Sequence, residues 1–280
     1  MNFMNRSNPI GFLDSGIGGL TVVKEAVSLL PNENIIYFGD TARTPYGSKS
    51  DELITDYALR GAHFLMKKNI KMLVVTCHTI SAVALDEIRK KIEVPVIGII
   101  EPGIKTALEE TKNKRIGVIG TEAVISSKAY SSQLKKLDKN IKVFEKACPL
   151  FEPLAEERLL DSKAVKMIAK NYLDEFKELD IDTLILGCSY YPVLADVISK
   201  VAGKKVKLIN AGKPAAYVLQ NYLEGRGIRS QSVQIGYHEF YLTDITVKTK
   251  SGAERFYGRK LDNLNKVDYL NTSDVKRQII

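Results

Sequence analysis

Two cysteines stand at matching places in the two halves of this 280-residue chain. Cys77 follows the apolar run Leu73–Val75, and Cys188 follows Leu184–Gly187, 111 positions later. Short apolar runs of this kind predict buried parallel strands. Since open α/β sheets bind ligands at the carboxyl ends of their strands, we expect one thiol on each side of a shared cleft.

These thiols could perform acid–base chemistry. A thiol must ionise before it can accept a proton, and free cysteine has a pKa near 8.5. Candidate charged partners are Asp14, in the turn after the first predicted strand, and a carboxylate within residues 152–157. A thiolate that faces a thiol could remove a proton from one side of a carbon atom and return one on the other.

Other uses of the cysteines are less favoured. Cys148 precedes Pro149 in a segment with no polar run, and we interpret it as an inert buried cysteine. A metal site formed by Cys77, His78 and Cys188 is disfavoured, because adjacent side chains at the end of a strand point apart. We therefore expect no metal.

The glycine-rich turn after the first strand also has two interpretations. Residues 16–19 resemble part of a phosphate-binding loop, but a GxGxxG motif needs a glycine at its sixth position, which is absent. A tight turn that presents Asp14 beside the start of a helix explains these residues better.

Strands and helices alternate along the chain. Strands are expected at 10–13, 34–38, 73–76, 94–100, 115–119, 184–187, 206–210 and 240–243, with Glu101-Pro102-Gly103 ending the fourth. Helices are expected at 20–30, 51–68, 79–91 and 155–179, and from 211 to about 223. The long polar loop at 39–48 is typical of an active-site loop.

The pattern of the first half repeats in the second. Residues 115–121 match the first strand and its turn at an offset of 106, close to the cysteine spacing. We therefore predict an α/β fold of two doubly wound parallel-sheet lobes, with the active site between them. The first lobe is expected to comprise 1–98 plus 210–245, the second 99–209, and a polar C-terminal extension 246–280.

Composition limits the other possibilities. The chain is 45% hydrophobic and 26% charged, with a net charge of +8, but its lysines are scattered, so nucleic-acid binding is not expected to be its main role. It has neither an apolar run long enough for a membrane span nor an apolar signal segment in residues 1–9. Three cysteines without CxxC spacing predict reduced thiols and a cytoplasmic location.

Four ordered motifs resemble those of glutamate racemases, over about residues 9–245. They are Gly11–Val22, Tyr37–Ser48, Cys148–Phe151 followed by Pro153-Leu154, and Leu186–Cys188 followed by Tyr191-Pro192. The resemblance implies an isomerase that interconverts L- and D-glutamate without a cofactor. It also implies a role in peptidoglycan synthesis, cell wall biogenesis and cell shape, and a homodimer without membrane partners.

The resemblance assigns roles to individual residues. It implies that Cys77 and Cys188 are the two acid–base thiols, that Asp14 assists Cys77, and that Glu156 lies on the Cys188 side. The substrate contacts that it implies are Ser15, Pro45, Tyr46, Gly47, Thr79 and Ser189.

Three positions depart from the motifs of these racemases, which usually have Cys-Asn-Thr and Cys-Thr-His. This chain has His78 after Cys77, Ser189 after Cys188, which keeps the hydroxyl, and Tyr190 where an imidazole usually serves the second thiol. Tyrosine has a pKa near 10 and transfers protons poorly at neutral pH, so His78 is expected to compensate in part. Alternative functions are racemisation of another amino acid such as aspartate, or ligand or partner binding with little turnover through the basic surface and the tail after Asp244.

Overall fold

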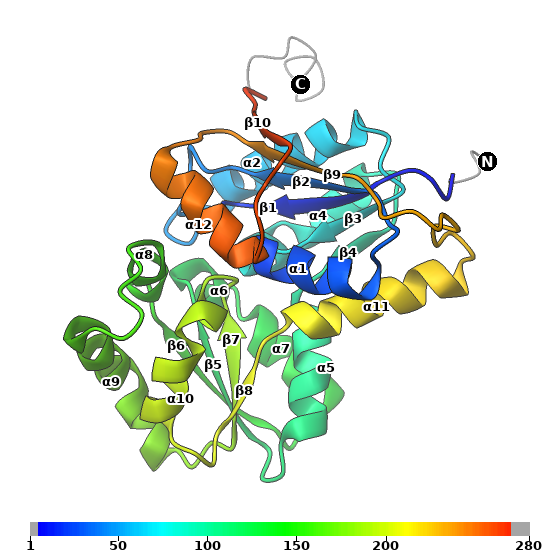
Figure 1. Ribbon diagram of the computed structural model, residues 1–280. Helices are drawn as coiled ribbons and strands as arrows, with labels where there is room; N and C mark the ends of the chain where they lie inside the picture. Colours follow the sequence, from blue (N-terminus) through cyan, green and yellow to red (C-terminus); the bar gives the residue numbers. More distant parts are fainter. Residues whose placement is uncertain (1–4, 270–280) are drawn as a thin grey trace.

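The computed structural model describes residues 5–269 and consists of two α/β lobes, each built on a parallel sheet (Figure 1). The first sheet has the strand order β10-β9-β2-β1-β3-β4, and the second has the order β6-β5-β7-β8. The fold class predicted from the sequence is therefore confirmed. The strands are β1 (Ile10–Asp14), β2 (Ile35–Gly39), β3 (Met72–Val75), β4 (Val96–Gly98), β5 (Arg115–Gly120), β6 (Lys142–Ala147), β7 (Thr183–Gly187), β8 (Lys207–Ile209), β9 (His238–Leu242) and β10 (Leu264–Lys266).

The two sheets share an arrangement of four strands. The order β2-β1-β3-β4 in the first lobe corresponds to β6-β5-β7-β8 in the second. Strands β3 and β7 are therefore equivalent, and each lies next to the strand that begins its half of the chain. Cys77 follows β3 after the single residue Thr76, and Cys188 directly follows β7. Both thiols thus occupy the carboxyl edge of a sheet, where parallel α/β folds place their ligands.

Helices cover both faces of each sheet (Figure 1). In the first lobe α1 (Leu20–Leu29), α11 (Gly212–Gly225) and α12 (Val247–Tyr257) pack on one face. The other face is covered by α2 (Asp51–Met66), α3 (His78–Val83) and α4 (Leu85–Lys91). In the second lobe α5 (Ile100–Glu110) and α7 (Ala129–Leu137) pack opposite α8 (Phe151–Glu156), α9 (Lys163–Glu178), the 3-10 helix η1 (Tyr191–Leu194) and α10 (Ala195–Ala202), while α6 (Glu122–Ser126) follows β5.

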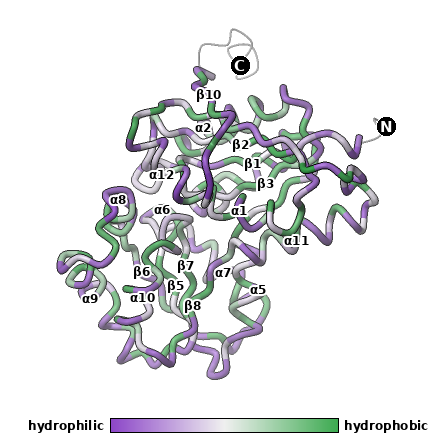
Figure 2. Tube along the Cα trace, in the orientation of Figure 1, coloured by the Kyte–Doolittle hydropathy of each residue, from purple (hydrophilic) through white to green (hydrophobic). Residues whose placement is uncertain are grey.

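One hydrophobic core continues from the first lobe into the second. It joins Phe12 and Leu20 of the first lobe to Ile119, Phe151 and Tyr190 of the second, all of them buried. Hydrophobic residues gather on the strands inside each lobe, and hydrophilic residues follow the outer helices and loops (Figure 2). Burial of this continuous apolar surface fixes how the lobes face each other.

The structure corrects three local expectations. Glu101-Pro102-Gly103 lie in the first turn of α5, where proline is tolerated, and do not end a strand. The expected helix 155–179 is interrupted, with α8 ending at Glu156 and α9 beginning at Lys163. Strand β6 was not expected, because its sequence KVFEKA is half charged and shows no regular alternation, and because the strand lies only partly buried at the sheet edge.

Residues 246–269 are more ordered than the polar sequence suggested. Helix α12 packs against α1, and β10 adds an edge strand beside β9. Strand β10 has only three residues and is largely exposed, so its sequence shows no periodic pattern that would predict a strand. Residues 270–280 of the expected extension lie outside the described residues. The proposed lobe boundaries at 98/99 and 209/210 coincide with the ends of β4 and β8.

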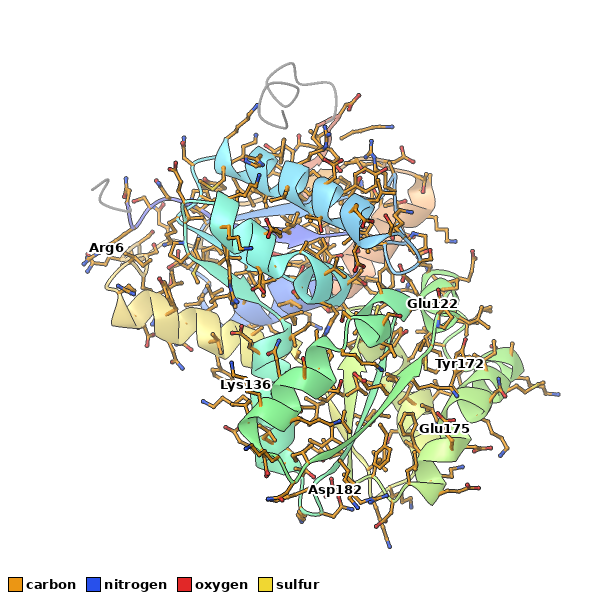
Figure 3. All side chains as sticks on the ribbon, turned by 180° about the vertical axis from the view of Figure 1, so that it is seen from behind. Arg6, Glu122, Lys136, Tyr172, Glu175 and Asp182 are labelled. Carbon is orange, nitrogen blue, oxygen red and sulfur yellow. The ribbon has the colours of Figure 1, made fainter. Side chains whose placement is uncertain are left out.

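A buried ion pair ties three distant segments of the first lobe together. The Nζ atom of Lys71 donates to Glu33 Oε2 at 2.5 Å and to the backbone carbonyls of Arg6 and Ile228 at 2.8 and 2.9 Å. Glu33 Oε1 in turn accepts the N–H of Ser230 at 2.7 Å. Arg6 lies beside the end of α11 (Figure 3), where its Nε donates to the carbonyl of the following turn.

We predict that Lys71→Met lowers the free energy of unfolding by about 3–5 kcal/mol, since it leaves the Glu33 carboxylate buried without its partner. Denaturant titration of the purified variant measures the loss. The matched control is the double variant Lys71→Met/Glu33→Gln, which removes both charges and should recover part of the stability. A single variant within about 1 kcal/mol of the wild type would contradict a stabilising role for the pair.

Candidate active site

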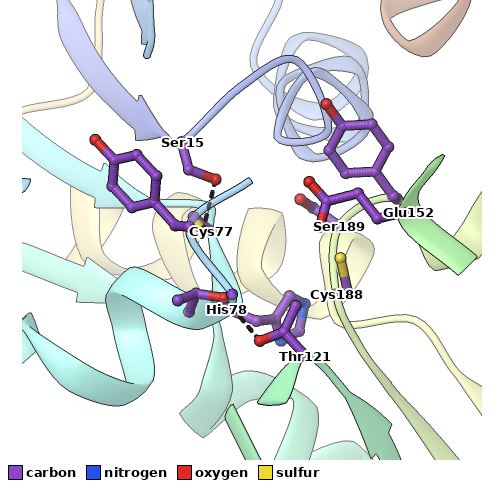
Figure 4. Close-up of a pocket in the computed structure, with 11 residues that line it drawn as sticks. Ser15, Cys77, His78, Thr121, Glu152, Cys188 and Ser189 are labelled. Atoms are coloured by element: carbon purple, nitrogen blue, oxygen red, sulfur yellow. Dashed lines mark hydrogen bonds between the residues drawn. The ribbon is translucent and has the colours of Figure 1, made fainter. Parts of the chain in front are cut away.

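Both thiols line one enclosed chamber between the lobes (Figure 4). The chamber has a volume of about 10 Å³, which is room for about one water molecule. Cys77 and Cys188 are 5% and 6% exposed. The lining residues are Ser15, Tyr46, Gly47, Cys77, His78, Thr79, Thr121, Glu152, Cys188, Ser189 and Tyr190.

The Cys77 side is built by the ends of β1 and β3. The Sγ atom of Cys77 lies 3.2 Å from Ser15 Oγ. Asp14 lies behind this pair, where its carboxylate accepts hydrogen bonds from Thr76 Oγ1 at 2.9 Å and from the Gly16 N–H at 3.0 Å. The tight turn after β1 therefore holds the carboxylate in place, as its glycines suggested.

Burial disfavours the negatively charged forms of Asp14 and Cys77. It raises the pKa of Asp14 to about 6, against the lowering effect of its hydrogen bond from Thr76. Burial also raises the pKa of Cys77 to about 12, and the charge of Asp14 adds to this. Since the thiolate and the carboxylate repel each other, ionisation of one group opposes ionisation of the other.

On the other side of the chamber, burial and a nearby carboxylate likewise disfavour the thiolate form of Cys188. Burial, followed by the charge of Glu152, raises the pKa of Cys188 well above its usual range, while the Tyr190 N–H lowers it. The Tyr190 hydroxyl donates to Glu156 Oε1 at 3.0 Å and accepts the Ile17 N–H at 3.5 Å. Burial also raises the pKa of that phenol well above 10, so its contribution at neutral pH is to hold hydrogen-bond partners.

Close backbone approaches bring the two lobes together around the chamber. A Cβ atom on Gly18 would lie 2.5 Å from Ser189 Oγ, and one on Gly47 would lie 2.5 Å from the Thr121 Cβ. Real Cβ atoms do not approach so closely, so both positions require glycine. The hydroxyls of Thr79 and Thr121 meet across the same junction at 3.0 Å.

Asp40 fixes the polar loop at 40–48. Its buried carboxylate accepts hydrogen bonds from Arg43 Nη1, Tyr46 OH, Thr243 Oγ1 and Tyr269 OH, at distances of 2.7–2.8 Å. Tyr46 and Gly47 are thereby placed against the chamber. Because Tyr269 follows β10, the C-terminal segment takes part in ordering this loop.

His78 is held as a neutral ring. Burial lowers its pKa to about 3. Its Nδ1 lies 2.7 Å from the hydroxyl of Tyr130 in α7, against which the ring stacks. A neutral ring supplies no positive charge to either thiol, so compensation for the missing imidazole by a charged His78 is not supported.

A larger cavity adjoins the chamber on its outer side. It has a volume of about 220 Å³ and shares Gly47, Thr121 and Glu152 with the chamber. Pro45 and Glu156 line this outer cavity, and neither lines the chamber. Of the predicted site residues these two therefore lie outside the thiols' immediate surroundings, and Asp14 lies behind Cys77.

Thr121, Glu152 and Thr44 are among the chamber and cavity residues that were not singled out from the sequence. Thr121 occupies the place of Ser15 in the internal repeat, and that correspondence could have revealed it. Glu152 was only one of several carboxylates considered in residues 152–157. Thr44, whose Oγ1 donates to Glu152 Oε1 at 3.4 Å, carried no signal beyond its place in the polar loop.

Residues 5–269 include no group of three histidine, cysteine or acidic side chains arranged to hold a metal ion. Over the same residues, none of the helices is long and apolar enough to cross a membrane.

Comparison with known proteins places this arrangement among racemases. The pattern of the Asp/Glu/hydantoin racemase family matches residues 20–216. The glutamate racemase of Geobacter metallireducens is 43% identical over 92% of this chain and 96% of its own, and that of Chlorobaculum tepidum is 42% identical over 94% and 97%. The crystal structure of glutamate racemase from Francisella tularensis in complex with D-glutamate superposes with a TM-score of 0.90, at 39% identity, over 94% of this chain and 98% of its own.

We predict that Asp14→Asn lowers the pKa of the Cys77 thiol, because the like charge that opposes its ionisation is removed. The ultraviolet absorbance of the thiolate, followed with pH and compared with Cys77→Ser protein, measures the shift. Asparagine keeps an oxygen to accept the Gly16 N–H, so the turn should remain folded. An unchanged Cys77 titration would show that the two groups are not coupled.

Proposed function

The chain belongs to the Asp/Glu/hydantoin racemase family, and from this we propose that it interconverts L- and D-glutamate by moving the α-proton between Cys77 and Cys188. The observation that carries the proposal is the pair of buried thiols, one from each lobe, at equivalent strand ends around one chamber. Two bases on opposite sides of a carbon atom are what inversion of its configuration requires.

Each direction of the reaction uses both thiols in turn. The Cys188 thiolate takes the α-proton of one enantiomer, and the Cys77 thiol then gives its proton to the opposite face of the carbanion. In the reverse direction the roles are exchanged, so protons balance without a cofactor. The enclosed chamber excludes water, which strengthens the electrostatic interactions that stabilise the carbanion.

Hydroxyl groups around the chamber supply substrate contacts in this proposal. Ser15 and Thr79 line it from the first lobe and Ser189 from the second, and each hydroxyl can donate to a carboxylate or accept from the α-ammonium group. Tyr46 and Gly47 line the chamber beside them, and the neutral ring of His78 is a further lining group that can form a hydrogen bond. Pro45 contributes from the outer cavity, where it guides the substrate inward.

Substrate entry requires the chamber to open. A volume of about 10 Å³ does not admit an amino acid, whereas the outer cavity of about 220 Å³ does. The outer cavity meets the chamber at Gly47, Thr121 and Glu152, which come from both lobes. We therefore propose that the substrate enters there as the lobes part, and that their closure shuts out water.

We further propose that the protein is a cytoplasmic homodimer that supplies D-glutamate for peptidoglycan. The odd number of cysteines, all of them free, supports a reducing compartment. Light scattering on the purified protein tests the dimer.

Cys77→Ser and Cys188→Ser should each lower racemisation by at least about 10²-fold, because each removes one of the two acid–base groups. Circular dichroism follows the reaction from each enantiomer, with no pyridoxal phosphate added. Cys148→Ser is the matched control: this third thiol is buried, donates to the carbonyl of Lys146 at 3.7 Å, lines neither cavity, and should be dispensable for turnover.

The same assay separates the alternatives. Activity on aspartate and none on glutamate would change the substrate and keep the mechanism. A protein that only binds ligands would introduce no solvent deuterium at the α-carbon of any amino acid, and that result would contradict catalysis.

Tyr190→Phe should lower kcat several-fold with little change in KM. It removes the hydroxyl that connects Glu156 to the Ile17 N–H, and thus a link between the lobes beside Cys188. The matched control is Tyr191→Phe, the same chemical change at the next residue, whose hydroxyl donates to the Cys148 carbonyl at 2.8 Å and lies outside the chamber lining. That control should cost stability and spare turnover; equal losses in the two variants would contradict a specific role for Tyr190.

A further inference from the structure

Glu152 is the acidic side chain that lines the thiol chamber. It lies in the first turn of α8, is 9% exposed, and borders both the chamber and the outer cavity. Its carboxylate reaches toward the chamber on the side of Cys188 and Ser189 (Figure 4). Thr44 of the first lobe donates to its Oε1 at 3.4 Å.

Glu152 and Cys188 line the same small chamber. The chamber has room for about one water molecule between the groups that line it. Both groups can therefore exchange a proton with water held in this space.

The charges around the chamber form two matching pairs. Among charged groups, Asp14 raises the pKa of Cys77 the most, and Glu152 raises the pKa of Cys188 the most. In each pair the like charges repel, so the thiolate forms when the carboxyl group holds the proton. The second lobe thus has its own counterpart to Asp14, supplied by a helix and not by the turn after a strand.

The surroundings of Glu152 keep it able to gain and lose a proton near neutral pH. Burial raises its pKa to about 7, and the charges of Glu156 and Asp14 add to the effect, while Thr44 and Lys49 oppose it. The other titratable groups that interact with it are Cys77, Cys188, Tyr190 and Tyr191.

Other groups near Cys188 are poorer candidates for this proton. Glu156 lines only the outer cavity and is engaged by the Tyr190 hydroxyl. Tyr190 itself holds its proton through the neutral range, and His78 stays neutral against Tyr130.

We propose that Glu152 takes the proton of Cys188 and returns it, and that it exchanges this proton with water in the outer cavity. This inference rests on the proposed racemisation. Before abstraction, Cys188 gives its proton to the Glu152 carboxylate and becomes the thiolate. The thiolate then takes the α-proton, Cys77 gives its proton to the carbanion, and Glu152 releases its own proton to the outer cavity. Cys77 regains a proton from water when the chamber opens, so the proton released through Glu152 and the proton taken up by Cys77 balance over one turnover.

The first test compares Glu152→Gln with wild type by circular dichroism from both enantiomers. We expect kcat/KM to fall about 10²-fold, mostly through kcat. The equilibrium constant between enantiomers is unity, so kcat/KM falls equally in both directions. The rise of wild-type activity through about pH 7, where Glu152 ionises, should be lost in Glu152→Gln and kept, at a lower rate, in Glu152→Asp.

The matched control is Glu157→Gln on the same segment. Glu157 is 60% exposed, pairs with Lys248 and lines neither cavity, so its removal should leave the rate and the pH profile as they were. A Glu152→Gln variant that raises KM alone, or that loses rate while keeping the limb near pH 7, would overturn the relay and make Glu152 a binding or structural residue.

A second test does not depend on turnover. Thiolate absorbance, taken as the difference from Cys188→Ser protein, should show Cys188 ionising at lower pH in Glu152→Gln, since the opposing charge is gone. An unchanged titration overturns the coupling. Because this readout needs no substrate, it reports on Glu152 even if the protein racemises no amino acid, and the two proposals can fail separately.

Discussion

The geometry of the chamber depends on the glycines Gly18 and Gly19 in the turn after β1, which have no side chains. A Cβ atom on Gly18 would collide with Ser189 across the lobe junction, and one on Gly19 would lie 2.1 Å from Thr76 Oγ1 and 2.4 Å from Asp14 Oδ2. Without these side chains the turn can touch the Cys188 segment and wrap the Asp14 carboxylate at once. Any larger residue would separate the lobes or displace the carboxylate, and the two thiols would no longer share one enclosure.

That enclosure creates an electrostatic conflict that the substrate can resolve. Two thiols and two carboxyl groups are buried in or behind a space the size of one water, and burial opposes every negative charge among them. An α-ammonium group brings the positive charge that the described chamber lining lacks, since His78 stays neutral. Binding of an amino acid therefore favours the ionised thiol, and the free enzyme keeps its thiols protonated and protected.

The sequence predicted the repeated architecture because each half carries its own signals. Buried parallel strands are continuous apolar runs, and the cysteine at the end of β3 recurs at the end of β7. Strand β6 and the segment from α12 to Tyr269 carried no such signal, since edge strands and partly exposed helices need little apolar surface.

The site residues also divide into those that the sequence indicated and those that it did not. Ser15 and Ser189 lie next to strand ends, and the resemblance to glutamate racemases had implied both of them from motifs that include those strands. Glu152 could not be preferred to Glu156, because the choice depends on which turn of α8 faces the chamber. Nothing local in the sequence links Asp40 to Tyr269, which lie 229 positions apart and meet only in the folded chain.

The contrast between the small chamber and the larger outer cavity has a consequence for inhibitor discovery. A compound designed to fill the closed chamber would have to be no larger than a water molecule, so the chamber offers no starting point for drug-sized ligands. The outer cavity has walls from both lobes, with Pro45 and Ser48 on one side and Pro149 and Pro153 on the other. A compound wedged there would bridge the lobes and block access without imitating an amino acid, and its selectivity would depend on Pro45, Ser48, Pro149 and Pro153, which have no part in the proposed proton transfer.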